Sequence, residues 1–344
     1  MNRFPALLAG LALTASGLTA CSTGPTDRAS DDHTGSTRTG GAEDGAYPVT
    51  IEHAFGETTI SEAPQRVVTV GWSDADLVAD LGVVPVGVPA ITWGGNANQS
   101  TDWFDARLKE LGGEQPTQYD DADGIPFDEL AQLQPDLVLA TNSGLTQADY
   151  TKLKKMGAHV VAYPDQAWGT PWQDSLEMVG DALGRPDAAD ALEDETEQAI
   201  ADAQKQYPDL VGKTAAWGWL TEGDTSTIGL CTSLDNRPRM LEEFGMEEAS
   251  IVSELGSDAF SANLSSEKAD TLDADVFVYY AEGAPQDPAA DALLGRIPAL
   301  KRGSYLAVED RASSLPMSSP TTLSIPVAIR DFLPQLNQAA QQVD

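Results

Sequence analysis

Short runs of apolar, mostly β-branched residues alternate along this chain with segments of helical periodicity. Within each run the apolar residues are consecutive rather than alternate, which is typical of strands buried on both faces of a parallel sheet. The helical segments end at glycine, which accepts the left-handed backbone conformation of a helix terminus. This pattern predicts an α/β fold. The expected strands cover residues 66–70, 136–140, 158–162, 214–220 and 275–280.

The 344 residues allow two domains of about 150 residues each. Between the third and fourth expected strands, the segment 186–207 opens with Pro186 and carries Leu192, Ile200 and Ala203 on one helical face. We therefore predict two Rossmann-like lobes with central, mostly parallel sheets, joined by this one long helix. The first lobe is expected over residues 47–185 and the second over residues 208–344. A single stiff helix between lobes allows only a small relative motion.

A faint internal repeat relates the two predicted lobes. Asp128 is followed five residues later by a leucine and eight residues later by Asp136, which opens a strand; Glu267 is followed at the same offsets by a leucine and Asp275. Each first acid falls near the start of a predicted helix, where a carboxylate suits the helix dipole. The dipole explains an acid at either place but gives no reason for a matched pair. We therefore favour a functional role for both.

The N-terminus indicates export. Arg3 is followed by an apolar stretch too short for a membrane span, as in a signal peptide over residues 1–20. The sequence before Cys21 resembles a bacterial lipobox, so Cys21 is expected to carry a lipid that anchors the protein to the extracytoplasmic face of the cell membrane. Residues 21–46 lack large apolar side chains and are expected to form a disordered tether. Cys231 then has no partner for a disulfide.

The charge and the scarcity of certain residues exclude whole classes of protein. With 20 Lys and Arg against 54 Asp and Glu, the formal net charge of -34 repels nucleic-acid phosphates. Three histidines and two cysteines are too few for a zinc or haem site built from clusters of those residues. The chain is therefore expected to bind no nucleic acid and to use no metal ligands of its own.

Four segments together are similar to a known family. They are residues 64–72, 81–88, 125–138 and 323–328, and their order and spacing resemble the periplasmic-binding-protein family in which a single helix joins the lobes. That family comprises solute-binding lipoproteins for ferric siderophores and vitamin B12. The resemblance implies a monomer that delivers a ferric siderophore to an ABC permease dimer with its ATPase. It also implies that Asp128 and Glu267 dock onto permease arginines, with Glu129 as the alternative to Asp128.

The candidate ligand contacts lie on loops after the expected strands, where ligands of α/β folds bind. These loops carry five tryptophans, Trp72, Trp93, Trp103, Trp168 and Trp172, and about half of them are expected to pack in the core. All but Trp172 are predicted to contact the ligand, because large flat side chains suit a bulky chelate. Arg237, Arg239 and the weaker candidate Arg311 would neutralise an anionic chelate, although pairing with nearby acids explains each arginine equally well. The chelator itself would hold the iron, so no cofactor and no catalytic residue is predicted.

Three other interpretations were weighed. Residues 71–75 superficially resemble a hydrolase nucleophile elbow around Ser73. Such a serine needs a histidine base, but the one histidine downstream, His159, falls in an expected strand. Ser73 fits better as a helix N-cap, with Asp76 three residues on. Residues 120–124 hint at a calcium loop and are more consistent with an exposed turn. Cobalamin or haem binding shares the fold and docking acids, with Tyr119 or Tyr163 as a haem ligand.

Overall fold

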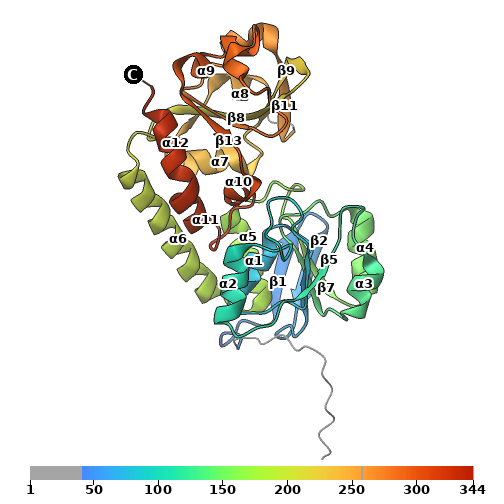
Figure 1. Ribbon diagram of the computed structural model, residues 1–344. Helices are drawn as coiled ribbons and strands as arrows, with labels where there is room; N and C mark the ends of the chain where they lie inside the picture. The colour runs from blue at the N-terminus through green and yellow to red at the C-terminus, as the bar shows by residue number, and fades with distance from the viewer. Residues whose placement is uncertain (1–40, 257–258, 344) are drawn as a thin grey trace, which may run out of the picture. The chain divides into compact units, whose positions relative to one another are not determined.

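Two β-sheets organise the protein, each in its own α/β lobe (Figure 1). The computed structural model describes residues 41–256 and 259–343. The first sheet is parallel throughout and has the order β5-β4-β3-β6-β7, so the chain winds outward in both directions from its central strand. Its strands are β3 (Val67–Thr69), β4 (Gly87–Pro89), β5 (Thr117–Tyr119), β6 (Leu137–Ala140) and β7 (His159–Ala162).

The second sheet is mixed, with the order β11-β9-β8-β12-β13 and β10 paired to β8. Strands β8, β10, β12 and β13 are parallel, whereas β9 is antiparallel to both of its neighbours. The strands are β8 (Thr214–Thr221), β9 (Asp224–Cys231), β10 (Glu247–Glu248), β11 (Ser261–Ser265), β12 (Val276–Tyr280) and β13 (Tyr305–Val308). The sequence pattern missed β4 and β5 of the first sheet and β9, β10 and β11 of the second. It also missed a separate hairpin of β1 (Val49–His53) and β2 (Gly56–Ile60).

Helices flank both sheets. Those of the first lobe are α1 (Asp74–Asp80), α2 (Asp102–Glu110), α3 (Phe127–Gln132), α4 (Gln147–Lys155) and α5 (Trp172–Leu183). The second lobe has α7 (Asn236–Glu243), α8 (Ser250–Glu254) and α9 (Pro298–Arg302), with 3₁₀ turns η1 (Ser266–Thr271), η2 (Pro288–Ala290) and η3 (Leu294–Arg296). Among the helices described within residues 41–343, none combines the length and the apolar character that a membrane span requires.

One long helix, α6 (Pro186–Gln206), joins the two sheets, and Figure 1 shows it running from the first lobe to the second. It packs against α5 and buries Ala189, Thr196, Ile200 and Ala203 in the core shared by both lobes. The predicted fold class, two α/β lobes joined by one long helix, is confirmed. The predicted domain boundaries stay predictions.

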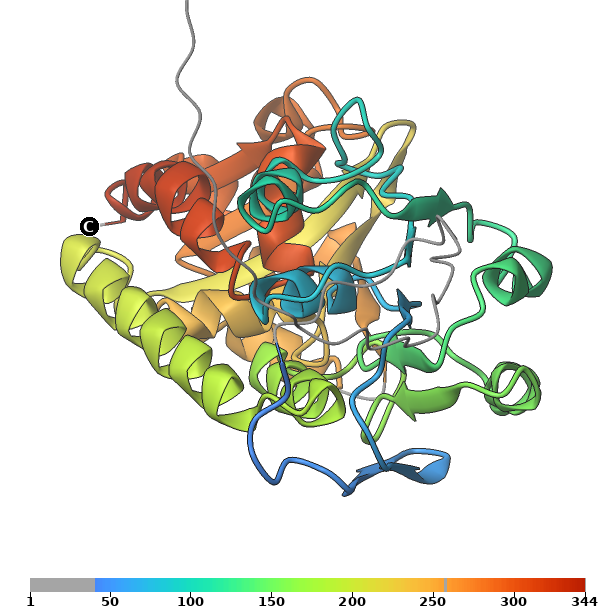
Figure 2. The same cartoon turned by 90° about the horizontal axis from the view of Figure 1, so that it is seen from below.

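The C-terminal segment makes a second connection between the lobes. After β13 the chain forms α10 (Arg311–Ser318), α11 (Ile325–Val327), the π-helical turn η4 (Ala328–Phe332) and α12 (Leu333–Ala340). In the turn after α10, Thr321 Oγ1 donates to Asp76 Oδ2 at 2.9 Å and Thr322 Oγ1 donates to Asp80 Oδ2 at 2.6 Å. Both acids lie on α1 of the first lobe, and Figure 2 shows the C-terminal helices in red beside teal α2. The long helix is therefore not the sole link.

The internal repeat has a common structural role in the two lobes. Asp136 opens β6 and accepts the backbone N–H groups of Gln65 and Arg66, just before the neighbouring strand β3, at 2.7 and 2.8 Å. Asp275 opens β12 and accepts the N–H of Thr214, the first residue of the neighbouring strand β8, at 2.9 Å. Each aspartate thus fixes the start of a central parallel pair.

The C-terminal helices are held to the second sheet by an aromatic stack. Phe332 is 1% exposed, and its ring lies 5.4 Å from that of Trp217 on β8, with an angle of 7° between the planes. Phe332→Ala should lower the free energy of unfolding by about 3–5 kcal/mol, because it leaves a cavity against the indole. Urea denaturation followed by circular dichroism measures this loss. Val211→Ala, at a side chain 52% exposed, should cost less than about 0.5 kcal/mol; equal losses would contradict the assigned role of the stack.

Candidate functional site

A cavity of about 530 Å³ lies where loops of both lobes meet, within the range of small-molecule sites. Trp72, Trp93, Asn142 and Trp168 reach it from the carboxyl ends of β3, β4, β6 and β7, as expected for a parallel sheet. The full lining is Trp72, Trp93, Asn142, Trp168, Asp235, Asn236, Arg237, Phe260 and Ser318. Three of the four predicted cleft tryptophans therefore come together here.

The aromatic walls are unusually accessible. Trp72 and Trp168 are 42% and 39% exposed, and their rings meet edge to face with centroids 5.8 Å apart. On another wall, Trp93 contacts Tyr280 at the same centroid separation. Exposed apolar surface of this kind marks a binding site, because covering it with a ligand removes it from water.

Trp168 has a strained backbone that its surroundings hold in place. Its φ of +62° lies in the left-handed region, which costs a non-glycine residue about 1–3 kcal/mol. Its N–H donates to Ser143 O at 3.0 Å, and its ring lies so close to Gly144 that a Cβ there would come within 2.7 Å of Nε1. These contacts hold the residue in its unfavourable backbone conformation and so fix the direction in which the indole points.

Arg239 supports the Trp168 loop from the other lobe. Its Nη1 donates to Gly169 O at 2.7 Å and its Nε to Ser233 O at 3.0 Å. Arg239 was predicted to contact the ligand, but the structure places it behind the loop and outside the cavity lining. It is a positioning residue that ties α7 to the backbone beside Trp168.

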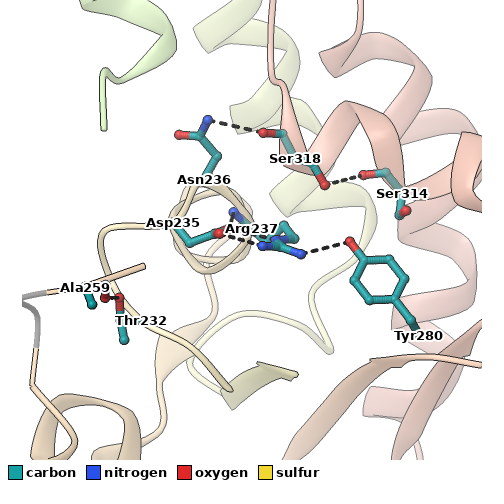
Figure 3. Close-up of polar contacts among 8 residues, drawn as sticks. All are labelled: Thr232, Asp235, Asn236, Arg237, Ala259, Tyr280, Ser314 and Ser318. Carbon is teal, nitrogen blue, oxygen red and sulfur yellow. Dashed lines mark hydrogen bonds and ion pairs between the residues drawn. The ribbon is translucent and has the colours of Figure 1, made fainter. Parts of the chain in front are cut away.

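Arg237 lines the cavity with its charge already compensated, as Figure 3 shows. Its Nε and Nη2 donate to the two carboxylate oxygens of Asp235 at 2.7 and 2.5 Å, and its Nη1 donates to the Tyr280 hydroxyl at 3.0 Å. Asp235 is also the N-cap of α7, accepting the backbone N–H of Arg237. This bidentate pair supplies the two charged residues of the lining, which is formally neutral.

A side pocket of about 90 Å³ adjoins the cavity, and Trp72 and Trp93 line both. At its wall, Asp76 Oδ2 accepts Trp103 Nε1 at 2.6 Å and Thr321 Oγ1 at 2.9 Å. Burial outweighs these two hydrogen bonds and raises the pKa of Asp76 to about 7. Trp103, predicted for the cleft, thus belongs to the side pocket.

Two further predicted residues lie elsewhere. Trp172 starts α5 and is buried in the core, in line with the expectation that some loop tryptophans would pack there. The Arg311 guanidinium pairs with Glu282 and lies 5.7 Å from the ring centre of Trp93, outside the cavity lining. It therefore matches the alternative interpretation of an arginine that answers a nearby acid.

The alternative interpretations find little support in the geometry. Ser73 occupies the N-cap position of α1, but its buried Oγ has no hydrogen-bond partner among the described residues, so the predicted capping box with Asp76 is wrong. The side chain of Asp76 turns instead to Trp103 and Thr321. The hydroxyls of Tyr119 and Tyr163 donate to the backbone carbonyls of Thr69 and Leu145 and are buried, which leaves neither available as a haem ligand.

The docking candidates are exposed on both lobes. Asp128 and Glu129 lie in the first turn of α3, and Glu267 lies in the first turn of η1. Arg296 donates to the backbone oxygen of Glu267, and the Glu267 carboxylate has no partner among the described residues. Cys21, the predicted lipidation site, and the signal peptide lie outside the described residues. Within residues 41–256 and 259–343, no cluster of His, Cys, Asp and Glu suits a metal ion.

Comparison with known proteins defines the class. Residues 67–308 match the family model described as periplasmic binding protein. The crystal structure of PiaA from Streptococcus pneumoniae TIGR4 in complex with ferrichrome is similar at 32% identity, with a TM-score of 0.79 over 86% of this chain and 100% of that one. The chain therefore belongs to the periplasmic binding protein family, whose members bind solutes outside the cytoplasm.

Two other solved structures show the same fold. A periplasmic solute binding protein from Mycobacterium smegmatis is 26% identical, with a TM-score of 0.70 over 85% of this chain and 98% of that one. SirA from Staphylococcus aureus, complexed with staphyloferrin B, is 20% identical, with a TM-score of 0.65 over 84% of this chain and 98% of that one. No protein with a curated description matches the sequence.

The role of Arg239 can be tested by fluorine NMR on protein labelled with 5-fluorotryptophan. Arg239→Ala removes the donor to Gly169 O, so we expect the Trp168 resonance, assigned from Trp168→Phe, to shift and broaden while that of the buried Trp217 stays in place. Arg239→Lys should restore part of the signal. Arg296→Ala, at an exposed ion pair, is the matched control; an unchanged Trp168 resonance in Arg239→Ala would remove the positioning role.

Proposed function

We propose that this protein is an extracytoplasmic solute-binding lipoprotein that captures a ferric siderophore in the 530 Å³ cavity and delivers it to an ABC importer. The observation that carries the proposal is the wall of exposed tryptophans from the first lobe facing Arg237 and Phe260 from the second. Flat aromatic faces suit the bulky organic shell of an iron chelate. The likeness to PiaA with ferrichrome supports the same ligand class.

The electrostatics of the cavity narrow the ligand class further. Free arginines were expected to neutralise an anionic catecholate or carboxylate chelate, but Arg237 is paired with Asp235 and Arg311 with Glu282. A dianionic or trianionic complex would have to break such a pair or stay uncompensated, which costs several kcal/mol in a desolvated site. We therefore propose a ferric trihydroxamate, whose iron-chelate core is uncharged, as the preferred cargo. The chelator holds the iron, and the protein supplies no metal ligand.

The ligand class is testable by quenching of tryptophan fluorescence. Ferrichrome, an uncharged ferric trihydroxamate, should bind at least about a hundredfold more tightly than a trianionic ferric triscatecholate, which corresponds to about 3 kcal/mol. Trp72→Ala should weaken ferrichrome by about tenfold or more, because this exposed indole becomes covered in the complex. Val211→Ala, at an exposed apolar side chain outside the lining, is the control.

Several outcomes would change the proposal. Tighter binding of the triscatecholate would overturn the choice of ligand class while leaving siderophore capture in place. Quenching by cobalamin or haem without quenching by any ferric chelate would replace siderophore capture by the corresponding alternative.

Delivery rests on the exposed acids. We propose that Asp128 or Glu129 on one lobe and Glu267 on the other contact arginines of an ABC permease dimer with its ATPase, that a lipid on Cys21 keeps the protein at the membrane, and that it acts as a monomer. The exposure of these carboxylates supports this, since charge-assisted hydrogen bonds to arginine need accessible oxygens.

Uptake and binding should separate in variants of these acids. Asp128→Ala combined with Glu267→Ala should leave the dissociation constant for the ferric chelate unchanged but reduce uptake of ⁵⁵Fe-chelate by cells about tenfold or more, because the docking pairs are lost. Asp202→Ala with Glu222→Ala, at exposed acids elsewhere, should leave uptake normal. Normal uptake in the first variant, followed by loss with Glu129→Ala, would move the docking role to Glu129.

A further inference from the structure

The side pocket beside the cavity carries features of a second recognition site. Resting on the proposed siderophore function, we propose that this pocket binds an alkylammonium group at the end of an arm of the ferric chelate, with Asp76 as its counter-ion. The pocket is lined chiefly by apolar and aromatic side chains. Those that the argument uses are Trp72, Trp93, Trp103, Asp76 and Asp121.

The carboxylate of Asp76 has one oxygen free for a ligand. Asp76 is 9% exposed, and both of its hydrogen bonds, from Trp103 and Thr321, go to Oδ2. Oδ1 accepts from no other group in the described part of the chain, although its residue lines the pocket. Because its residue lines the pocket and this oxygen accepts no other donor, Oδ1 is available to accept a hydrogen bond from a ligand.

The charges around the pocket select a cation. Asp121 stands on the lining with Asp76, and the lining contains no Lys, Arg or His. The charged groups nearby already have partners. Asp80 accepts a hydrogen bond from Thr322 and forms an ion pair with Arg107, and Arg311 forms an ion pair with Glu282. An anionic or neutral guest would leave the acidic side chains of this lining without a counter-ion. An ammonium group would donate to the free Oδ1 of Asp76 and compensate the charge of that carboxylate.

The walls suit the stem of such an arm. Three indoles, Trp72, Trp93 and Trp103, line the pocket, and indole faces attract ammonium groups as well as methylene chains. The volume of about 90 Å³ is room for a short aliphatic chain rather than for a second chelate. Because Trp72 and Trp93 also line the cavity, a chelate held there can extend an arm directly into the pocket.

Three ferric trihydroxamates separate the arm from the chelate core. Ferrioxamine B ends in a primary amine, its N-acetylated derivative has the same core without the charge, and ferrichrome has no arm. Wild-type protein should bind ferrioxamine B about tenfold more tightly than the acetylated form, the size expected for a desolvated ammonium beside a carboxylate and indoles. In Asp76→Asn this ratio should fall below about threefold. Asp80→Asn, one turn along the same helix and outside the lining, should keep it.

The pH profile of the wild-type protein tests the same counter-ion without a substitution. Protonation of Asp76 below about pH 7 should weaken binding of ferrioxamine B and leave the acetylated form unaffected. Asp80 is the acid whose charge acts on this carboxyl, and Asp121 lies on the same pocket lining. Equal affinity for the two forms, or a ratio that persists in Asp76→Asn, would overturn the ammonium site while siderophore capture stands. Failure of all three chelates to bind would overturn both.

Discussion

Hydrogen bonds between the C-terminal turn and α1 determine how the two lobes face each other. Thr321 and Thr322 donate to Asp76 and Asp80, and bonds to charged groups are each worth about 1.5–3 kcal/mol. Two further links join the lobes: Arg239 of the second lobe donates to Gly169 O of the first, and the long helix α6 connects them. The binding cavity is built from loops of both lobes, so its dimensions depend on these links. The long helix and the C-terminal turn together restrict the relative motion of the lobes more than the single helix expected from the sequence would.

The same contacts place carboxylates where water is scarce. Asp74, buried at the start of α1, accepts the N–H and hydroxyl of Thr141, yet burial raises its pKa to about 6, and that of Asp76 to about 7. The folded protein therefore holds protons on these groups that the unfolded chain releases above about pH 4. This contribution to stability is present in acid and is lost as the pH rises through about 7. For Asp76, which lines the side pocket, such a cost at neutral pH indicates that its position serves a site rather than stability.

The sequence predicts β3, β6, β7, β8 and β12, because strands buried on both faces must be apolar at every position. It does not predict β4 and β5, which are only three residues long and carry no such apolar run. The strands β9 and β11 were not predicted because their sequences contain Thr, Ser and Gly and carry no consecutive apolar run. Loop position sufficed to place Trp72 and Trp168 at the cavity. The partners of Arg239 and Arg311 could not be predicted, because Gly169 and Glu282 lie 70 and 29 residues away in the sequence and are brought close only by the tertiary structure.

The chain has a formal net charge of -34, yet the cavity lining is formally neutral because Asp235 and Arg237 pair with each other. The Asp235–Arg237 pair leaves the main cavity without net charge, whereas Asp76 and Asp121 give the side pocket an acidic lining. Shape and aromatic contact then select the core of the ligand, and charge selects only its appendage. Discrimination of this kind works by penalty, since a misplaced charge in a desolvated site costs more than a lost contact. A protein that divides recognition in this way can accept several chelate cores and still distinguish them by the group that each one carries at its edge.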